Sequence, residues 1–314
     1  MSRQLEPGVR LARRRGLTLF ELLIAILLLA IVGGGITKVM IKQQQYYKDS
    51  SKSAGAKREL RLGATVLPAE LRSISSSGGD ILTMGENQME MHAYIGSGVI
   101  CERNAAANAD KVWIPPTNLA HHTLTTFVTV PEIGDTVFLF NENDLKGAQD
   151  DQWEKRVIIA KGSDADKCLG APYTDIAQDA GKRRPWFQFN AVIPDSVKVG
   201  SVIRFSRPVR YSIYQETSGK WYLGLSEYTG SWGSASPVAG PYSAFASGDA
   251  NPSGLQFRYY DSLGVRVTNM ANKTDVARVD VFLRTNAGAS AITERHGNAV
   301  RDSILMRVAI RNFK

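Results

Sequence analysis

The stretch RRRGLTLFELLIAILLLAIV, residues 13–32, determines how the rest of this chain is organised. Three arginines precede Gly16, and the long apolar run that follows contains a single charged residue, Glu21. About 20 predominantly apolar residues cross the roughly 30 Å hydrocarbon core of a bilayer as a helix. Each strongly apolar residue favours insertion by roughly 0.3–0.6 kcal/mol, whereas one carboxylate opposes it by roughly 3 kcal/mol. The sequence therefore predicts a membrane-spanning helix, and an acid inside such a helix indicates a functional position.

The nine residues from Gly16 to Ile24, GLTLFELLI, also carry a family resemblance. They resemble the class III signal of type IV prepilins and pseudopilins, G-[FL]-T-L-x-E-L-L-I. The resemblance implies that the prepilin peptidase, a membrane aspartyl peptidase, cuts between Gly16 and Leu17 and methylates the new amine of Leu17. It also implies that Glu21, the fifth residue after the cut, is needed for filament assembly.

Electrostatics supports these roles for Leu17 and Glu21. Cleavage would release a cationic amine four residues before the acid, and an unpaired ion in apolar surroundings costs several kcal/mol. An amine of a neighbouring subunit at 4 Å would attract the carboxylate by roughly 4 kcal/mol at an effective dielectric constant of 20. Because much of that attraction offsets desolvation, we expect the pair to fix the register between subunits more than to strengthen the polymer.

Three other interpretations of this stretch stay open. A plain membrane anchor explains the apolar run and the basic leader, but it does not explain Glu21. A conventional secretory signal could use the glycines at 33–35 as its small-residue cleavage site. A twin-arginine export signal could begin at residues 13–14, although the Gly-Leu pair that follows fits its consensus poorly.

Length, charge and cysteine content bound the rest of the chain. The 314 residues suffice for one large domain or two modest ones after the helix. Half of the formal net charge of +8 belongs to residues 1–16, where five arginines oppose Glu6. Such a leader orients insertion with its positive side in the cytoplasm, so the charge is weak evidence for a nucleic-acid partner. Cys101 and Cys168 form one disulfide if the body lies outside the cytoplasm, or remain two buried thiols.

The helix is expected to continue beyond the membrane, from Leu17 to Ser75, over about 90 Å. The glycines at 33–35 each lower helix propensity by roughly 1 kcal/mol relative to alanine. The helix there is therefore either bendable or locally melted, or packed closely against another membrane helix. Pro68 is expected to kink it. An apolar stripe along one face predicts packing on a globular domain: Leu60, Ala64, Leu67, Leu71 and Ile74.

The remaining chain predicts short strands separated by turn residues. A Gly/Ser/Pro/Ala-rich interval, Tyr228–Gly254, predicts a long loop that is either functional or disordered. We predict an α+β fold, with a long N-terminal helix packed on a β-rich domain of antiparallel sheet. Its parts are a leader (1–16), a transmembrane helix (17–36), an amphipathic extension (37–75) and a β-rich periplasmic or extracellular domain (76–314). The expected strands are Met89–Tyr94, Leu124–Val130, Thr136–Phe140, Arg156–Lys161, Trp186–Phe189, Val202–Tyr214, Trp221–Leu225, Leu255–Tyr260, Val276–Arg284 and Ser303–Arg311.

The segments LPAELRSIS and GLQFRYYD…ARVDVFLRT…ILMRVAIRN, at 67–75 and 254–312, carry a second, more diffuse resemblance. They look like large minor pilins of the PilW kind and J-type pseudopilins of type II secretion. That resemblance implies a structural subunit near a filament tip, in a pilus or a secretion apparatus. It implies other minor pilins or pseudopilins and the major pilin as partners through the N-terminal helix, besides the prepilin peptidase and inner-membrane lipid. The implied location is the bacterial inner membrane, with a cytoplasmic N-terminus and a periplasmic body, and then the filament.

The sequence offers no catalytic constellation. No serine lies in a G-x-S-x-G motif, and the histidines, at 92, 121, 122 and 296, lack the spacing of a zinc site. An acidic loop around Gly147 fails the calcium-loop pattern at Leu145. We therefore expect neither enzymatic activity, nor a metal, nor a cofactor.

Nucleic acid is the rival ligand, because phosphate binding needs basic residues gathered on one face. The run Lys182–Trp186 joins three cations to an aromatic, and Arg204, Arg207 and Arg210 add to it. Basic strand surfaces are also common solubility devices, and we expect no direct nucleic-acid contact. The alternative function is a membrane-anchored periplasmic binding module that does not polymerise, with DNA binding in uptake as its most specific form.

Overall fold

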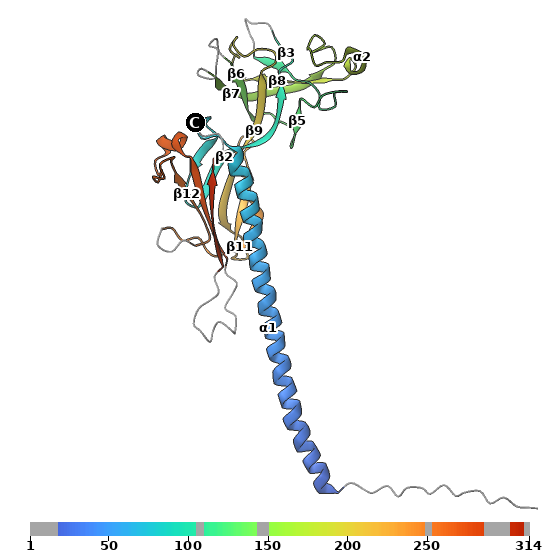
Figure 1. The fold of residues 1–314 in the computed structure, drawn as a ribbon, viewed down its shortest axis with the longest axis vertical. Coiled ribbons are helices and arrows are strands. Elements are labelled where there is room, and N and C mark those ends of the chain that lie inside the picture. Colours follow the sequence, from blue (N-terminus) through green and yellow to red (C-terminus); the bar gives the residue numbers. More distant parts are fainter. Residues whose placement is uncertain (1–17, 105–109, 143–150, 249–252, 286–301, 311–314) are drawn as a thin grey trace, which may run out of the picture.

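A computed structural model describes residues 18–104, 110–142, 151–248, 253–285 and 302–310. It shows a 55-residue helix, α1 (Leu19–Ser73), and an antiparallel β-rich body of two lobes (Figure 1). The predicted α+β fold is confirmed. Two short helical elements, α2 (Ile176–Asp179) and η2 (Met270–Asp275), accompany the strands. The strands are β1 Ile81–Met84, β2 Gln88–Val99, β3 Glu102–Arg103, β4 Lys111–Trp113, β5 Thr126–Phe127, β6 Thr136–Asn141, β7 Gln152–Asp164, β8 Arg184–Phe189, β9 Val202–Gln215, β10 Trp221–Glu227, β11 Ser236–Tyr242, β12 Leu255–Tyr260, β13 Arg278–Arg284 and β14 Ser303–Ala309.

Helix α1 is continuous over its whole length. The glycines at 33–35 stay helical, so the locally melted state expected there is not adopted, and the helix is not broken at Pro68. The hydroxyl of Thr37 donates to the carbonyl of Gly33 over 2.8 Å, which adds a bond next to the weak segment. Around Pro68, burial of Leu67 and Leu71 against the body fixes the helix where the proline removes one backbone donor.

The helix lobe consists of the C-terminal part of α1, the sheet β12–β13–β14, strands β1, β10 and β11, and the adjoining halves of β2 and β9. The predicted stripe of α1 packs into its core, with one change. Ala64 is only half-buried, and Gly63 occupies the closest approach instead. A Cβ at Gly63 would lie 2.5 Å from Oη of Tyr242 and 2.8 Å from Cδ1 of Leu283. Only a residue without a side chain lets the helix lie so near the sheets.

The distal lobe lies beyond the C-terminal end of α1 and contains β3–β8 with the other halves of β2 and β9 (Figure 1). Strand β9 pairs with β2 along one edge and changes partner along the other. Ile203–Ser206 pair with β6, whereas Val209–Gln215 pair with β10. Pro208 lies at the change, where a residue without a backbone donor costs no ladder bond. Two long strands thus carry both cores.

The interval predicted as a long loop contains a strand. β11 (Ser236–Tyr242) pairs with β10 and packs on α1, where Tyr242 Oη donates to the carbonyl of Glu59 over 3.1 Å. The Gly/Pro-rich composition hid it, because its pairing comes from tertiary contact rather than from local propensity. At Leu124–Val130 the predicted strand is too long, because the structure has only the two-residue strand β5 (Thr126–Phe127) there. Strands β1, β3 and β4 were not predicted.

Candidate functional site

Glu21 lies in the first turn of α1 and closes a capping box with Thr18. The Glu21 N–H donates to Oγ1 of Thr18 over 3.2 Å, and the N–H and hydroxyl of Thr18 both donate to Oε2 of Glu21, over 3.0 and 3.1 Å. The box satisfies backbone donors that a helix start leaves without partners. Within the described residues Oε1 accepts no hydrogen bond, so one carboxylate oxygen is available to another donor.

The N-terminal half of α1 is apolar and uncovered. It projects away from the body (Figure 1), and its large apolar side chains are exposed, from 41% for Ile24 to 82% for Leu19. Among the described residues, this helix alone is long and apolar enough to cross a membrane. An exposed apolar surface of this size marks a site of contact with lipid or protein. The described body does not provide that cover.

Residues 11–37 match the family model described as the Prokaryotic N-terminal methylation motif, which includes the apolar run and Glu21. This match supports a type IV prepilin-like protein. Searches of the curated proteins and of the solved structures gave no match. The similarity to prepilins therefore rests on the N-terminal segment of the chain. The apolar helix is consistent with a single-pass membrane anchor. Gly16 and Leu17 lie outside the described residues, so cleavage and methylation there stay predictions.

A buried ion pair ties the C-terminal end of α1 to strand β9. Asp80, with its side chain 1% exposed, accepts two hydrogen bonds from Nη2 of Arg204, over 2.7 and 2.9 Å. The same carboxylate accepts the N–H of Ser75, just beyond the last helical turn, over 2.7 Å. Burial raises the pKa of Asp80, and the positive charge of Arg204 opposes that shift. The end of the helix is thereby linked to a residue of the distal half of β9.

His92 lies beside this ion pair as a neutral ring. Its Nε2 is 3.0 Å from Nζ of Lys155, and the ring packs edge-on against Phe138 with the centroids 5.6 Å apart. Burial, followed by the positive charges of Lys155 and Arg204, lowers the pKa of His92 to about 3. Burial also lowers the pKa of Lys155. The neutral imidazole can therefore accept a hydrogen bond from Lys155 without adding a charge. We call this region, where the ion pairs of Arg204 and Arg207 lie between the two lobes, the junction.

Arg207 holds the point at which β9 changes partner. Its Nε and Nη2 donate to the two oxygens of Asp135, each over 2.8 Å, and its Nη1 donates to Glu227 over 3.0 Å. Asp135 directly precedes β6 and Glu227 ends β10, so one guanidinium joins the two strands that share this edge. The hydrogen bonds to Asp135, followed by the one to Glu227, raise the pKa of Arg207 above its ordinary value.

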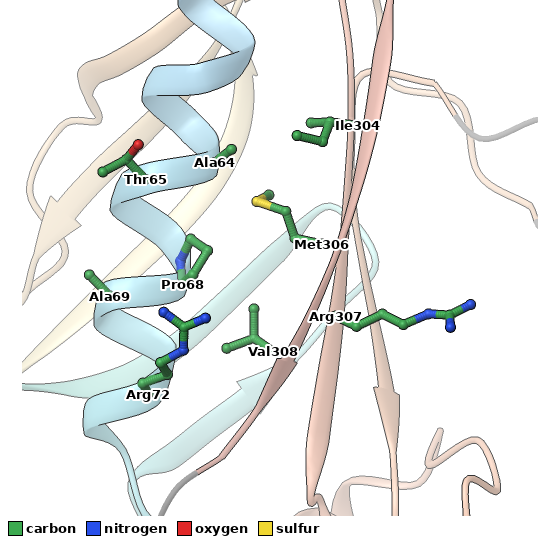
Figure 2. A pocket seen from close by; sticks show the side chains of 9 residues that line it. All are labelled: Ala64, Thr65, Pro68, Ala69, Arg72, Ile304, Met306, Arg307 and Val308. Carbon is green, nitrogen blue, oxygen red and sulfur yellow. The ribbon is translucent and has the colours of Figure 1, made fainter.

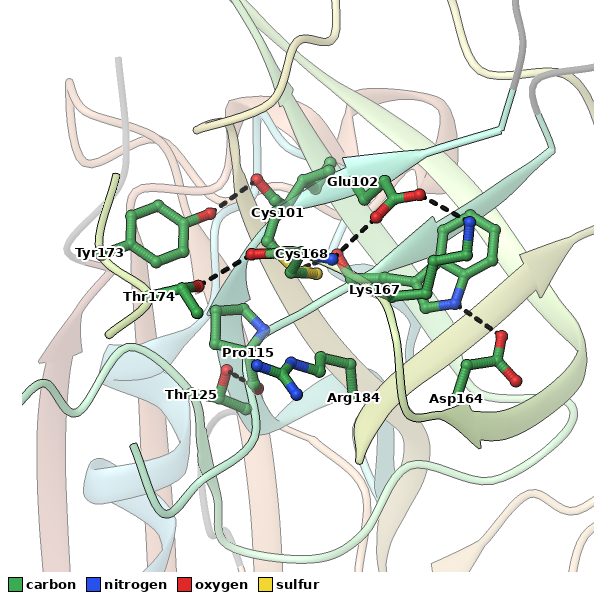
Figure 3. The surroundings of a disulfide bond; sticks show 12 residues. Cys101, Glu102, Pro115, Thr125, Asp164, Lys167, Cys168, Tyr173, Thr174 and Arg184 are labelled. Atoms are coloured by element: carbon green, nitrogen blue, oxygen red, sulfur yellow. Dashed lines mark hydrogen bonds and ion pairs between the residues drawn. A yellow bond between two sulfur atoms is a disulfide. The ribbon is translucent and has the colours of Figure 1, made fainter. Parts of the chain in front are cut away.

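Cys101 and Cys168 form a disulfide in the distal lobe, with their Cα atoms 5.2 Å apart (Figure 3). The sequence had left this pairing open. Glu102 anchors the second cysteine, because its carboxylate accepts the Cys168 N–H and the Lys167 ammonium, each over 2.7 Å. The bridge joins residues 67 apart in sequence, and such a cross-link stabilises by about 4 kcal/mol in the chain-entropy account.

The basic residues considered for nucleic acid are engaged within the body. Arg204 and Arg207 form the ion pairs above, and Arg210 approaches Glu90 to 2.5 Å. Arg184 is fully buried and donates to backbone carbonyls. These cations are held by the chain's own carboxylates and carbonyls rather than displayed as one basic surface.

No group of three or more His, Cys, Asp or Glu side chains in the described part of the chain is placed to hold a metal. The acidic loop around Gly147 lies mostly within 143–150, outside the described residues.

The junction acids Asp80 and Asp135 were not predicted from sequence. Each follows a glycine with positive φ, Gly79 at +79° and Gly134 at +96°, and each directly precedes a strand. An acid after a turn glycine is the one local signal that could have indicated them. Their arginines arrive only through the pairing of β9.

Proposed function

We propose that this prepilin-like chain is a minor pilin or pseudopilin, a structural subunit that initiates or caps a type IV pilus or a type II secretion pseudopilus. The prepilin peptidase cuts it between Gly16 and Leu17, and the amine of Leu17 is methylated. One observation carries the proposal: the methylation motif at 11–37 surrounds Glu21 at the start of a helix whose apolar surface is uncovered.

Glu21 acts twice in this proposal. In the single chain it closes the capping box with Thr18, which holds the carboxylate at the helix start. In the filament its other oxygen, Oε1, accepts a hydrogen bond from the N-terminal amine of Leu17 in a neighbouring subunit. At about 4 Å and an effective dielectric constant of 20 the attraction is roughly 4 kcal/mol. Desolvation consumes much of it, so the pair sets the register between helices.

The proposed location is the bacterial inner membrane, with the leader in the cytoplasm and the body in the periplasm. The arginines before Gly16 support that orientation, because cytoplasmic flanks are rich in Lys and Arg. The Cys101–Cys168 disulfide supports it as well, because disulfides persist in oxidising compartments such as the periplasm.

The distal lobe favours a terminal position in the filament. It lies beyond the C-terminal end of α1 (Figure 1), where the next subunit outward would stand if the helices stacked in parallel. The partners are then other minor pilins or pseudopilins and the major pilin through the N-terminal helix, besides the prepilin peptidase and membrane lipid. We propose a purely structural role, without catalysis, cofactor or nucleic acid.

The decisive experiment determines the N-terminal residue and the intact mass of the protein isolated from its native membrane. We expect a chain that starts at methylated Leu17. A chain that starts at Met1 would indicate that the helix is a simple membrane anchor for a binding module. A chain that starts after Gly35 would indicate an ordinary signal peptide. Either of these results overturns the proposal.

A further inference from the structure

Strand β14 presents an open edge beside α1. It ends the sheet β12–β13–β14 and pairs with β13 alone among the described strands. The Ile310 N–H donates to the carbonyl of Ala277 over 2.9 Å, and with the register this directs the backbone groups of alternate residues, Ile304–Val308, toward β13. The N–H and C=O groups of Leu305 and Arg307 therefore point outward, because bonded and unbonded pairs alternate in antiparallel ladders.

A groove separates this edge from the helix (Figure 2). Its volume is about 620 Å³, and the helix lines it with short or compact side chains such as Ala64 and Pro68. Met306 points from the strand toward the helix, whereas the side chain of Arg307 points away from it. Arg72 adds a cation on the helix side. The groove is thus lined mainly by apolar side chains, with Thr65 as a polar residue on the helix and positive charge at its borders.

The rows of side chains across the sheet define what a further strand should carry. On the face toward α1, the rows that end at Ile304, Met306 and Val308 are apolar throughout. On the other face one row alternates in charge, since Arg258 lies opposite Asp280 and Asp280 lies opposite Arg307. Arg307 ends that row with its side chain 69% exposed and its Nε 3.9 Å from Asp280. A carboxylate at the next place would continue the alternation, and opposite charges on facing strands attract.

We propose that an extended segment of another protein subunit enters this groove and adds to β14 as a fourth strand. Its side chains alternate, with apolar groups toward α1 and a carboxylate opposite Arg307. Main-chain hydrogen bonds give such a strand its affinity, and the alternate side chains give it specificity. A second copy of β14 fits poorly, because Ser303–Ala309 contains an arginine and no acid.

The test uses the full-length chain in lipid nanodiscs and a labelled peptide, VTVDVTV, blocked at both ends. This peptide is identical in both directions, so either strand orientation places its valines toward α1 and its aspartate opposite Arg307. We expect saturable binding by fluorescence anisotropy, and affinity weaker by about fivefold or more for VTVKVTV, because like charges then face each other. Binding does not depend on cleavage at Gly16, so its failure is distinct from failure of the proposed function.

Two variants separate strand addition from simple charge attraction. Leu305→Pro removes an outward N–H while sparing the bonds to β13, and we expect a loss of about fivefold or more in affinity. Arg307→Glu should invert the preference, so that VTVKVTV binds better than VTVDVTV. Arg61→Glu, an exposed helix residue outside the groove, serves as the matched control and should change neither affinity.

Circular dichroism establishes that each variant is folded, and if Leu305→Pro is not, the inverted preference of Arg307→Glu decides. The absence of saturable binding overturns the proposal. Binding that is unchanged in both Leu305→Pro and Arg307→Glu also overturns it. A dimer that forms without peptide and dissociates in Leu305→Pro would assign the groove to a second copy and would likewise overturn it.

Discussion

The two halves of α1 share one continuous backbone and have opposite surroundings. In the N-terminal half Leu27 is 57% exposed, whereas in the C-terminal half Leu67 and Leu71 are 0% and 1% exposed. The apolar side chains of the N-terminal half are not covered by the described body, whereas those of the C-terminal half are buried against the body of their own chain. If the chain assembles as proposed, assembly and folding depend on different residues of the same helix, and substitutions can separate them.

The largest expected effect is loss of assembly in Glu21→Leu, with the thermal unfolding of the body unchanged. Glu21→Gln sharpens the test, because glutamine can preserve the capping box with Thr18 but cannot pair as a charge. We expect both variants to be processed and to be absent from filaments, measured by immunoblotting of sheared filaments. If the glutamine variant assembles, the charge pairing is wrong and the cap alone matters.

Truncation of a buried leucine should instead lower the stability of the body. Leu67→Ala is expected to lower the free energy of unfolding by about 2–5 kcal/mol, the range for buried leucines. Leu27→Ala is its matched control in the exposed half and should leave that free energy unchanged. Denaturant unfolding followed by tryptophan fluorescence measures both. Equal effects in the two halves would contradict the division of α1.

Loss of the disulfide tests how much the bridge in the distal lobe contributes to the stability of the body. Cys101→Ser should destabilise the body by about 2–4 kcal/mol, because the bridge closes a long loop in the unfolded chain. Near-ultraviolet circular dichroism and denaturant unfolding follow the change, and wild type under reducing conditions is the control. An unchanged midpoint would show that the bridge contributes nothing to the fold.

Acid should weaken the junction that holds the end of α1. The pKa of His92 is about 3 in the folded chain against an ordinary 6.5, so between these values the unfolded chain binds the extra proton. The contribution of His92 is complete above pH 6.5 and falls as the pH drops toward 3, by at most about 1.4 kcal/mol per pH unit. Burial raises the folded pKa of Asp80, so its protonation acts in the opposite direction.

The difference between wild type and His92→Gln isolates this contribution, because Asp80 is present in both chains. From pH 7 to pH 5, wild type should lose about 1–2 kcal/mol more stability than the variant. Parallel pH profiles would show that His92 is not held neutral.

The smallest effect is expected at the glycines of the exposed half. A Cβ at Gly34 meets no atom within 4 Å, so Gly34→Ala should raise helix stability by at most about 1 kcal/mol and leave the body unchanged. We expect normal incorporation into filaments, by the same immunoblot. Reduced incorporation would show that assembly needs a bend or close helix packing there.

Local signals predicted much of this molecule. The apolar run gave α1, and strict alternation gave β12 at its observed bounds, Leu255–Tyr260. The nine residues around Glu21 carry the site because their chemistry is contiguous in the chain. Strand β13 was extended too far, to Val276, which instead ends the η2 turn as its cap.

Distant pairings could not be predicted from the sequence. β11 exists because β10 and α1 cover it, and Gly63 rather than Ala64 enters the core because Tyr242 and Leu283 lie against that turn. The junction likewise joins Asp80 to Arg204 and Asp135 to Arg207, pairs 124 and 72 residues apart. Periodicity within one element contains no information on such partners.

The partner change of β9 also has a mechanical consequence. β2 and β9 run roughly along the length of the molecule and enter both lobes (Figure 1). Tension between the distal lobe and the helix lobe would therefore be carried along the covalent backbones of two paired strands, so the lobes cannot separate by losing side-chain contacts alone. Arg207 crosses the same level as a side-chain clamp. A subunit at the end of a filament would transmit a pull on its outer lobe to its helix before the lobes part.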